Sequence, residues 1–153
     1  MILFLDYDGV LHPLNKKEAK FCRTDLLDAF LVEHPRIEVV LSTSWRQIFP
    51  LPALLDMLPS TIAERVIGTT PIFPSAAHEQ PAGVREHECR TWLSRNGRGD
   101  AIWLALDDNP ALFATPERVV LCDPLVGLTP ETIDELRQRY RDDRVSEGYG
   151  IHF

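Results

Sequence analysis

Paired cysteines are missing from this sequence. Its three cysteines, Cys22, Cys89 and Cys122, are an odd number and include no C-x-x-C spacing. The pattern excludes a disulfide framework and a zinc knuckle as the basis of the fold. We expect the three thiols to be reduced and buried.

A membrane-spanning segment is also missing, because no apolar run approaches the length that a bilayer requires. The apolar residues Met1–Leu5 lead directly into Asp6, and no basic region of the kind that begins a signal peptide precedes them. We therefore expect no contact with a membrane and a cytoplasmic location.

Positive charge is in deficit, with 16 Lys and Arg residues against 23 Asp and Glu residues and a formal net charge of −7. Such a chain is a poor candidate for broad, non-specific binding to a phosphate backbone, although a local basic groove is still possible.

Internal repeats are absent too, and the linker-like stretch Pro71–Gly83 is too short to separate two cores. A chain of 153 residues can bury roughly 70% of the surface that its unfolded form exposes. We predict a single domain over residues 1–153.

Short apolar runs alternate with helical patterns along the chain. The predicted strands are Ile2–Leu5, Ile37–Ser42, Arg65–Ile67, Ala101–Leu106 and Arg118–Cys122, with a loop-rich segment beginning at Gly68. The predicted helices are Asp25–His34, Pro52–Leu58, Val84–Arg95 and a last one from Thr129 to about Tyr140. Runs that are apolar throughout are typical of strands buried on both faces of a parallel sheet. The alternation therefore predicts an α/β fold with a doubly wound, mostly parallel sheet flanked by helices.

Polar residues follow three of the predicted strands, at Asp6–Gly9, Ser42–Ser44 and Asp107–Asn109. In a doubly wound fold, ligands bind beyond the carboxyl ends of the strands, so these residues should meet at one edge. Carboxylates gathered there would raise one another's pKa values unless a hard cation lay among them. We predict that this cation is Mg²⁺ and that a substrate phosphate completes its coordination shell.

The same residues carry a resemblance to a known family. Leu3–Leu11, which reads LFLDYDGVL, resembles the first motif of the haloacid dehalogenase (HAD) superfamily of phosphatases and phosphotransferases. Val40–Thr43 is similar to the second motif, Arg85 stands where the third-motif base is expected, and Leu104–Asp108 resembles the fourth. This resemblance implies a HAD-like Rossmannoid fold.

A narrower resemblance covers more of the chain. Ser42–Trp45, Arg85–Leu93, Leu106–Asp108 and Gly127–Thr129 resemble the small HAD domain of Swiss Army Knife RNA repair proteins. The spacing of the motifs leaves little room for an inserted cap, so we expect a capless or minimally capped site.

Roles follow from the resemblance, residue by residue. Asp6 would be the nucleophile that forms an aspartyl-phosphate, and Asp8 the general acid and base. Thr43 would hydrogen-bond a phosphoryl oxygen, and Arg85 would neutralise charge on the phosphate and on Asp6. Magnesium would be held by Asp6, the backbone carbonyl of Asp8, and one or both of Asp107 and Asp108.

Several of these assignments have alternatives. Ser42 or Ser44 could replace Thr43, and Arg46 or Arg90 could replace Arg85, because the family more often has lysine at the third motif. The hydroxyl residues could instead cap a helix that begins near Trp45. Arg85 could be a solvated residue of a first helical turn. The three tryptophans are expected in the core, with stacking of Trp45 on a nucleic-acid base as a further option.

The function that these expectations favour is a Mg²⁺-dependent phosphomonoesterase acting through an aspartyl-phosphate. An open site favours a phosphate on a large molecule, such as a nucleic-acid end or a phosphoprotein. A phosphoacceptor receiver-like domain is an alternative, although it predicts Lys-Pro after its last strand where this chain has Cys122–Pro124. A non-catalytic phosphate-binding module is another. The sequence leaves open the oligomeric state and whether water or another acceptor takes the phosphoryl group.

Overall fold

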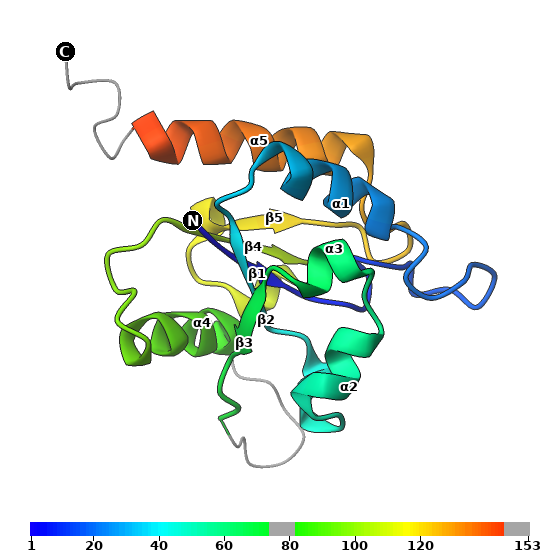
Figure 1. The fold of residues 1–153 in the computed structure, drawn as a ribbon, viewed down its shortest axis with the longest axis horizontal. Helices are drawn as coiled ribbons and strands as arrows, with labels where there is room; N and C mark the ends of the chain where they lie inside the picture. Colours follow the sequence, from blue (N-terminus) through cyan, green and yellow to red (C-terminus); the bar gives the residue numbers. More distant parts are fainter. Residues whose placement is uncertain (74–81, 146–153) are drawn as a thin grey trace.

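A five-stranded parallel sheet forms the centre of the protein (Figure 1). The computed structural model describes residues 1–73 and 82–145. The strands lie in the order β3-β2-β1-β4-β5. Their bounds are β1 Ile2–Leu5, β2 Glu38–Leu41, β3 Val66–Thr69, β4 Trp103–Asp107 and β5 Val119–Leu121. The predicted α/β class is confirmed, and every strand pair within the described residues is parallel.

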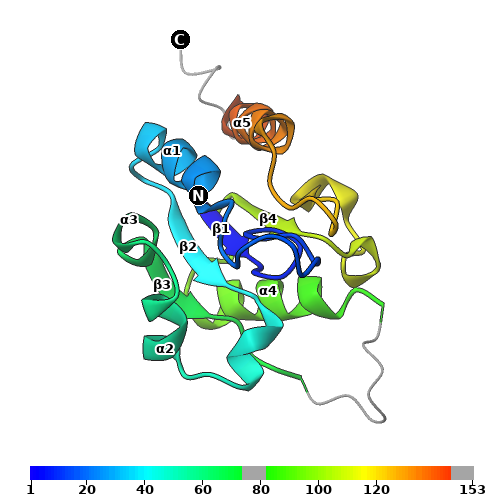
Figure 2. The same cartoon turned by 90° about the vertical axis from the view of Figure 1, so that its right-hand side faces the viewer.

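Helices cover both faces of this sheet (Figures 1 and 2). Helices α1 (Thr24–Glu33) and α5 (Pro130–Arg144) lie on one face and α4 (Val84–Arg95) lies on the other. The β2-to-β3 connection contains the 3-10 helix η1 (Ser44–Gln47), α2 (Leu51–Asp56) and α3 (Ser60–Ala63). Two further 3-10 helices, η3 (Pro110–Leu112) and η4 (Pro116–Arg118), connect β4 to β5. No helix in the described parts of the chain is long and apolar enough to cross a membrane.

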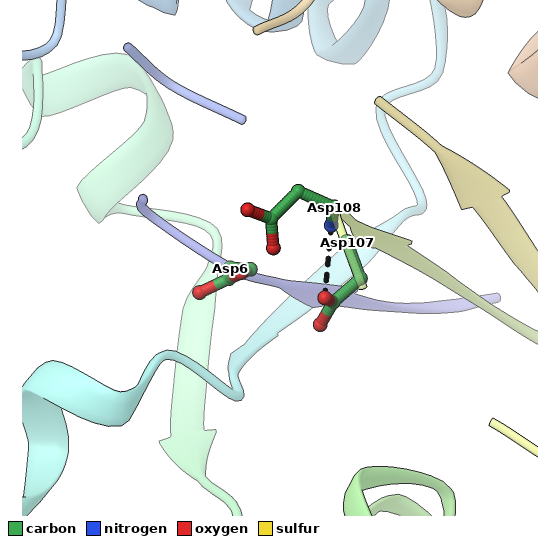
Figure 3. Close-up of side chains that lie close together, drawn as sticks. All are labelled: Asp6, Asp107 and Asp108. Carbon is green, nitrogen blue, oxygen red and sulfur yellow. Dashed lines mark hydrogen bonds between the residues drawn. The ribbon is translucent and has the colours of Figure 1, made fainter. Parts of the chain in front are cut away.

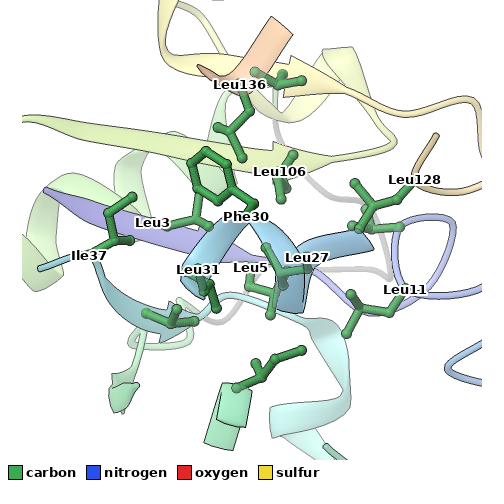
Figure 4. Packing of buried hydrophobic residues seen from close by; sticks show 14 of the residues in the cluster. Leu3, Leu5, Leu11, Leu27, Phe30, Leu31, Ile37, Leu106, Leu128 and Leu136 are labelled. Atoms are coloured by element: carbon green, nitrogen blue, oxygen red, sulfur yellow. The ribbon is translucent and has the colours of Figure 1, made fainter. Parts of the chain in front are cut away.

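The core is divided into two layers because successive side chains of a strand point to opposite faces of the sheet. In β1, Leu3 and Leu5 belong to the layer beneath α1 and α5, whereas Ile2 and Phe4 belong to the layer beneath α4. Figure 4 shows the first layer, in which the Phe30 ring of α1 lies close to Leu3, Leu106 and Leu136. A strand that is apolar at every position is therefore buried on both sides, as its sequence predicts.

Several predicted boundaries differ from those of the structure. Gly68 lies inside β3 instead of beginning a loop, because its missing side chain makes room for α4: a Cβ there would lie 3.1 Å from Nε1 of Trp92. Helix α3 was not predicted, and α5 continues one turn beyond Tyr140 to Arg144. Cys22 is partly exposed, whereas the other two free cysteines are buried as expected. Most of the predicted linker, residues 74–81, lies outside the described residues.

The path of the chain creates a switch point at the central strand. From β1 the chain moves outward to β2 and β3, and it then crosses by way of α4 to β4 on the other side of β1. The connections that leave β1 and β4 therefore run apart at the carboxyl ends of these two strands, which is where open α/β sheets bind their ligands. Polar residues that follow β1 and β4 lie at this switch point.

Candidate active site

Three of the predicted acidic residues meet at the switch point (Figure 3). Asp6 follows β1 and Asp107 ends β4, and the two strands pair at Leu5 and Leu106. One carboxylate oxygen from each of Asp6, Asp107 and Asp108 lies within 4.8 Å of the others. The side chain of Asp8 is not part of this cluster, so three carboxylates converge there and not the four expected.

Backbone N–H groups fix the orientation of two of these carboxylates. Oδ1 of Asp107 accepts hydrogen bonds from the backbone N–H of Asp108 at 2.8 Å and of Asn109 at 3.0 Å. Figure 3 shows the first of these bonds. Oδ1 of Asp6 accepts from the N–H of Tyr7 at 2.8 Å. The chain that turns after each strand therefore aims the carboxylate that ends it.

Arg85, in the first turn of α4, bridges two members of the cluster. Its Nη1 lies 2.8 Å from Oδ2 of Asp107 and 3.4 Å from Oδ2 of Asp6. The Arg85 side chain is buried, so it is not the solvated first-turn residue that the sequence left open. The other two candidates are engaged elsewhere, because Arg46 pairs with Glu88 at 2.7 Å and Arg90 with Glu86 at 3.0 Å.

The cluster is buried and carries more negative than positive charge, and the pKa values of its members reflect both. Burial and the charge of Asp107 raise the pKa of Asp6 well above its usual value, and Arg85 only partly opposes them. The same two causes raise the pKa of Asp108 to about 6. Burial by itself would lower the pKa of Arg85, but Asp107 and Asp6 more than offset it and raise the pKa above its usual value. Arg85 therefore stays charged and neutralises one of the three carboxylates.

This donor set fits a divalent cation. The three side chains offer carboxylate oxygens, the hard ligands that Mg²⁺ prefers, within the span of one coordination shell. The second indication is that burial and mutual repulsion raise the pKa values of Asp6 and Asp108, since a cation between these carboxylates would stabilise their ionised forms against both effects. Asp6, Asp107 and Asp108 are the residues that could hold it.

Gly9 makes room for the cluster. Its φ of +72° lies in the left-handed region, which glycine occupies without strain. A Cβ at this position would lie 2.3 Å from Oδ2 of Asp108. The glycine of the first motif is thus required both by the turn after Asp8 and by the carboxylate that fills the space beside it.

Asp8 lies outside the cluster and is held by two aromatic residues. Its Oδ1 lies 2.8 Å from Nε2 of His12, and its Oδ2 accepts a 2.8 Å hydrogen bond from Nε1 of Trp45. The Asp8 side chain remains 41% exposed, which leaves it within reach of a substrate. Sequence reasoning missed both partners. The only signal for His12 is its place four residues after Asp8 in a chain that turns at Gly9, and Trp45 was expected in the core.

Of the hydroxyl residues after β2, Ser42 and Thr43 are buried and Ser44 is half-buried. Thr43 caps η1 as one alternative predicted, because its Oγ1 accepts from the N–H of Trp45 at 3.3 Å. Capping uses the oxygen as an acceptor and leaves the hydroxyl hydrogen to donate elsewhere. The Oγ of the neighbouring Ser42 is buried and has no hydrogen-bond partner within the described residues. Both hydroxyls therefore remain candidates for binding a phosphoryl oxygen.

Comparison with known proteins assigns the family. The family model described as the HAD domain in Swiss Army Knife RNA repair proteins matches residues 2–133. This range contains the acidic cluster and every other site residue predicted from the sequence. No curated protein and no solved structure matches the chain.

Proposed function

The chain belongs to the family of HAD domains found in Swiss Army Knife RNA repair proteins, and on this premise we propose that it is a Mg²⁺-dependent phosphomonoesterase with Asp6 as its nucleophile. The observation that carries the proposal is the convergence of Asp6, Asp107 and Asp108 at the ends of β1 and β4. Arg85 supports it further, because its guanidinium contacts both the nucleophile and Asp107.

The reaction would proceed in two displacements. In the first, a carboxylate oxygen of Asp6 attacks phosphorus, the bond to the leaving oxygen breaks, and Asp8 gives its proton to that oxygen. In the second, a water molecule attacks the aspartyl-phosphate and passes a proton to Asp8. The bond between Asp6 and phosphorus then breaks, which releases phosphate and returns both aspartates to their starting forms.

Neighbouring groups would stabilise the phosphoryl group as it is transferred. Arg85 would hold Asp6 in place and offset the charge of the phosphoryl oxygens. Thr43 would donate its hydroxyl hydrogen to one of those oxygens, with Ser42 as the alternative because its hydroxyl has no partner within the described residues. Bound Mg²⁺, held by Asp6, the carbonyl of Asp8 and one or both of Asp107 and Asp108, would supply positive charge against the phosphoryl oxygens.

We propose a large phosphorylated molecule, in particular a nucleic-acid end, as the substrate. Residues 6–23, between β1 and α1, contain no inserted helix or strand that would cover Asp8. The same segment carries the exposed lysines Lys16, Lys17 and Lys20, which give a basic surface to a chain whose overall charge is −7. The family description, which refers to RNA repair, supports the same substrate class.

The proposal is tested with a small chromogenic phosphate monoester, measured with Mg²⁺ and with a chelator. We expect turnover by the wild type only with Mg²⁺ and none by Asp6→Asn. The matched control is Asp56→Asn, which makes the same change at an exposed position and should leave turnover unaltered. Equal activity of wild type and Asp6→Asn would refute the assignment. Magnesium-dependent phosphate binding without hydrolysis of any ester would favour the binding module, and stable phosphorylation of another aspartate would favour the receiver-like domain.

Substrate class requires a second comparison. Oligonucleotides with a 5′- or a 3′-terminal phosphate, a phosphopeptide and a sugar phosphate are assayed for released phosphate under the same conditions. We expect kcat/KM to be highest for one of the oligonucleotides. Equal values for the oligonucleotides and the sugar phosphate would contradict a nucleic-acid end as the substrate.

A further inference from the structure

The geometry around Asp8 points to a function for two residues that the family roles leave unassigned. We propose that His12 and Trp45 are positioning residues that hold the Asp8 carboxyl group in the orientation needed for proton transfer. Each binds a different oxygen of Asp8 at 2.8 Å, and the centroids of the two rings lie 5.9 Å apart. The role depends on the proposed function, because it assumes that Asp8 is the general acid and base.

The direction of both hydrogen bonds is determined by the chemistry of the rings. An indole N–H can only donate, so Trp45 Nε1 is the donor to Asp8 Oδ2. The tautomer of His12 follows from its second nitrogen, since Nδ1 accepts a hydrogen bond from the backbone N–H of Phe21 at 3.2 Å. We therefore assign the ring proton of neutral His12 to Nε2, which donates it to Asp8 Oδ1.

The residue that fixes this tautomer is itself conformationally unusual. Phe21 has a φ of +62°, in the left-handed region that residues other than glycine seldom occupy. Such a backbone is strained and persists only where its surroundings impose it. Here the strained residue both donates to His12 and packs its ring edge-on against the His12 ring, with centroids 5.1 Å apart.

Trp45 is also held in place by packing against aromatic rings. Its ring makes edge-on contacts with Tyr7 at 5.6 Å and with Phe21 at 5.7 Å between centroids. Tyr7 is fully buried, and its hydroxyl donates to the backbone carbonyl of Leu54 at 2.9 Å. The two donors of Asp8 therefore belong to one packed aromatic cluster, made of Tyr7, His12, Phe21 and Trp45.

Two fixed donors restrict the carboxyl group of Asp8 in a specific way. One N–H on each oxygen prevents rotation of the carboxyl plane, so the remaining lone pairs keep one direction. That direction matters in the step in which Asp8 protonates the leaving oxygen, and it matters most for leaving groups that cannot depart without a proton. Loss of a donor should therefore slow the hydrolysis of alkyl phosphates far more than that of activated aryl phosphates.

The kinetic test compares kcat/KM for an alkyl phosphate and for p-nitrophenyl phosphate. The variants are Trp45→Phe, which keeps an aromatic ring without its N–H, His12→Leu, which removes the donor, and His12→Gln, which restores an N–H.

General acid catalysis contributes about 10²- to 10⁴-fold to a rate. We therefore expect kcat/KM for the alkyl ester to fall by about 10- to 100-fold in Trp45→Phe and in His12→Leu. We expect losses within about threefold for the aryl ester, and recovery of most of the alkyl activity in His12→Gln. His87→Leu, at an exposed histidine, is the matched control.

The tautomer of His12 is measured independently by ¹⁵N nuclear magnetic resonance of the imidazole nitrogens in the wild type. We expect the Nε2–H form, and the Nδ1–H form would overturn the proposal. Equal losses for both esters, or an unchanged alkyl activity in both donor-free variants, would also overturn it while the proposed function stands. A wild type that hydrolyses neither ester with Mg²⁺ would refute the proposed function and this role together.

Discussion

At Gly9, a single methyl group would enter the space that Asp108 occupies. A Cβ would lie 2.3 Å from Oδ2 and 2.9 Å from Cβ of Asp108, so the whole side chain would have to move. Gly97 offers a matched comparison, because its φ of +68° resembles the +72° of Gly9 but nothing lies within 4 Å of its Cβ position. The two glycines separate the effect of backbone strain from that of crowding at the site.

We predict that Gly97→Ala loses about 1–2 kcal/mol of unfolding free energy from backbone strain alone. Gly9→Ala should lose more than this and should also lose Mg²⁺-dependent phosphatase activity, because Asp108 is displaced. Urea unfolding and ester hydrolysis of both variants test this expectation. Normal activity in Gly9→Ala would show that the position of Asp108 is not critical.

Arg85 is the cation that pairs with the buried carboxylates of Asp6 and Asp107. Replacing it with Met leaves Asp6 and Asp107 buried without a counter-charge, and the loss of one partner from a buried ion pair costs about 3–5 kcal/mol. Arg85→Lys keeps the charge and should lose much less, particularly because Nε of Arg85 is buried without a partner within the described residues. Urea unfolding in the presence of chelator measures both. Equal stability of the Met and Lys variants would mean that the charge of Arg85 does not stabilise the fold.

Residue types and order predicted the acidic cluster, but not the partners of Asp8. Asp6 and Asp107 follow apolar runs, so their placement at strand ends could be predicted from the sequence. The contacts of Asp8 with His12 and Trp45 depend on how the loop after β1 packs against η1, which no local pattern encodes. Whether Arg85 is buried or solvated could not be predicted for a related reason, because it depends on which elements pack against the first turn of its helix.

Among the elements, α4 is attached to the chain that precedes β5 through one carboxylate. Glu86 accepts hydrogen bonds from the N–H of Ala114 and of Thr115, from the Thr115 hydroxyl, and from Nε of Arg90. Burial alone would raise the pKa of Glu86, but these donors more than offset it and lower the pKa below its usual value. The ionised form is therefore the one that stabilises the folded state.

The sign of the pH dependence follows from that shift. Because the pKa of Glu86 is lower in the folded than in the unfolded protein, its contribution is complete above the unfolded value of about 4.3. The contribution is lost as the pH falls through the lower, folded value. We predict that Glu86→Gln is less stable than the wild type by about 1–3 kcal/mol at pH 7, and that the difference shrinks below about pH 4. Urea unfolding across pH tests this, with the exposed Glu64→Gln as control. A difference that does not change with pH would contradict the role of the charge.

Element boundaries were predictable where a local signal marked them. Helix α4 begins and ends as predicted, at Val84 and Arg95, because Asn96-Gly97 provides a stop signal. Gly68 was predicted to begin a loop because glycine is typical of loops, whereas in β3 its missing side chain leaves room for Trp92 of α4. Local signals locate helix ends well, but they do not reveal a glycine that is selected by packing.

For the molecule as a whole, the order of the strands determines which residues meet. Asp6 and Asp107 are far apart in sequence. They become neighbours because the chain returns from β3 by way of α4 and places β4 beside β1. Alternation of strands and helices predicted a parallel sheet but not this order. The resemblance to the HAD family supplied what the pattern could not, because its motifs belong to strands that are adjacent in that fold.

A metal that binds only the folded chain should stabilise the entire molecule. Binding at a free concentration of 100 times the dissociation constant contributes about 2.7 kcal/mol, which corresponds to roughly 5–11 °C in Tm for a chain of this size, at 2–4 °C per kcal/mol. We predict that Mg²⁺ raises the Tm of the wild type by about this amount and has little effect on the Tm of Asp108→Asn.

With chelator present we expect Asp108→Asn to be the more stable of the two proteins, because removing Asp108 relieves a cluster whose charges repel. Thermal unfolding of both proteins with Mg²⁺ and with chelator tests both signs. If Asp108→Asn is instead the less stable protein with chelator and gains as much from Mg²⁺ as the wild type, Asp108 is not a metal ligand and the cation must be held by Asp6 and Asp107.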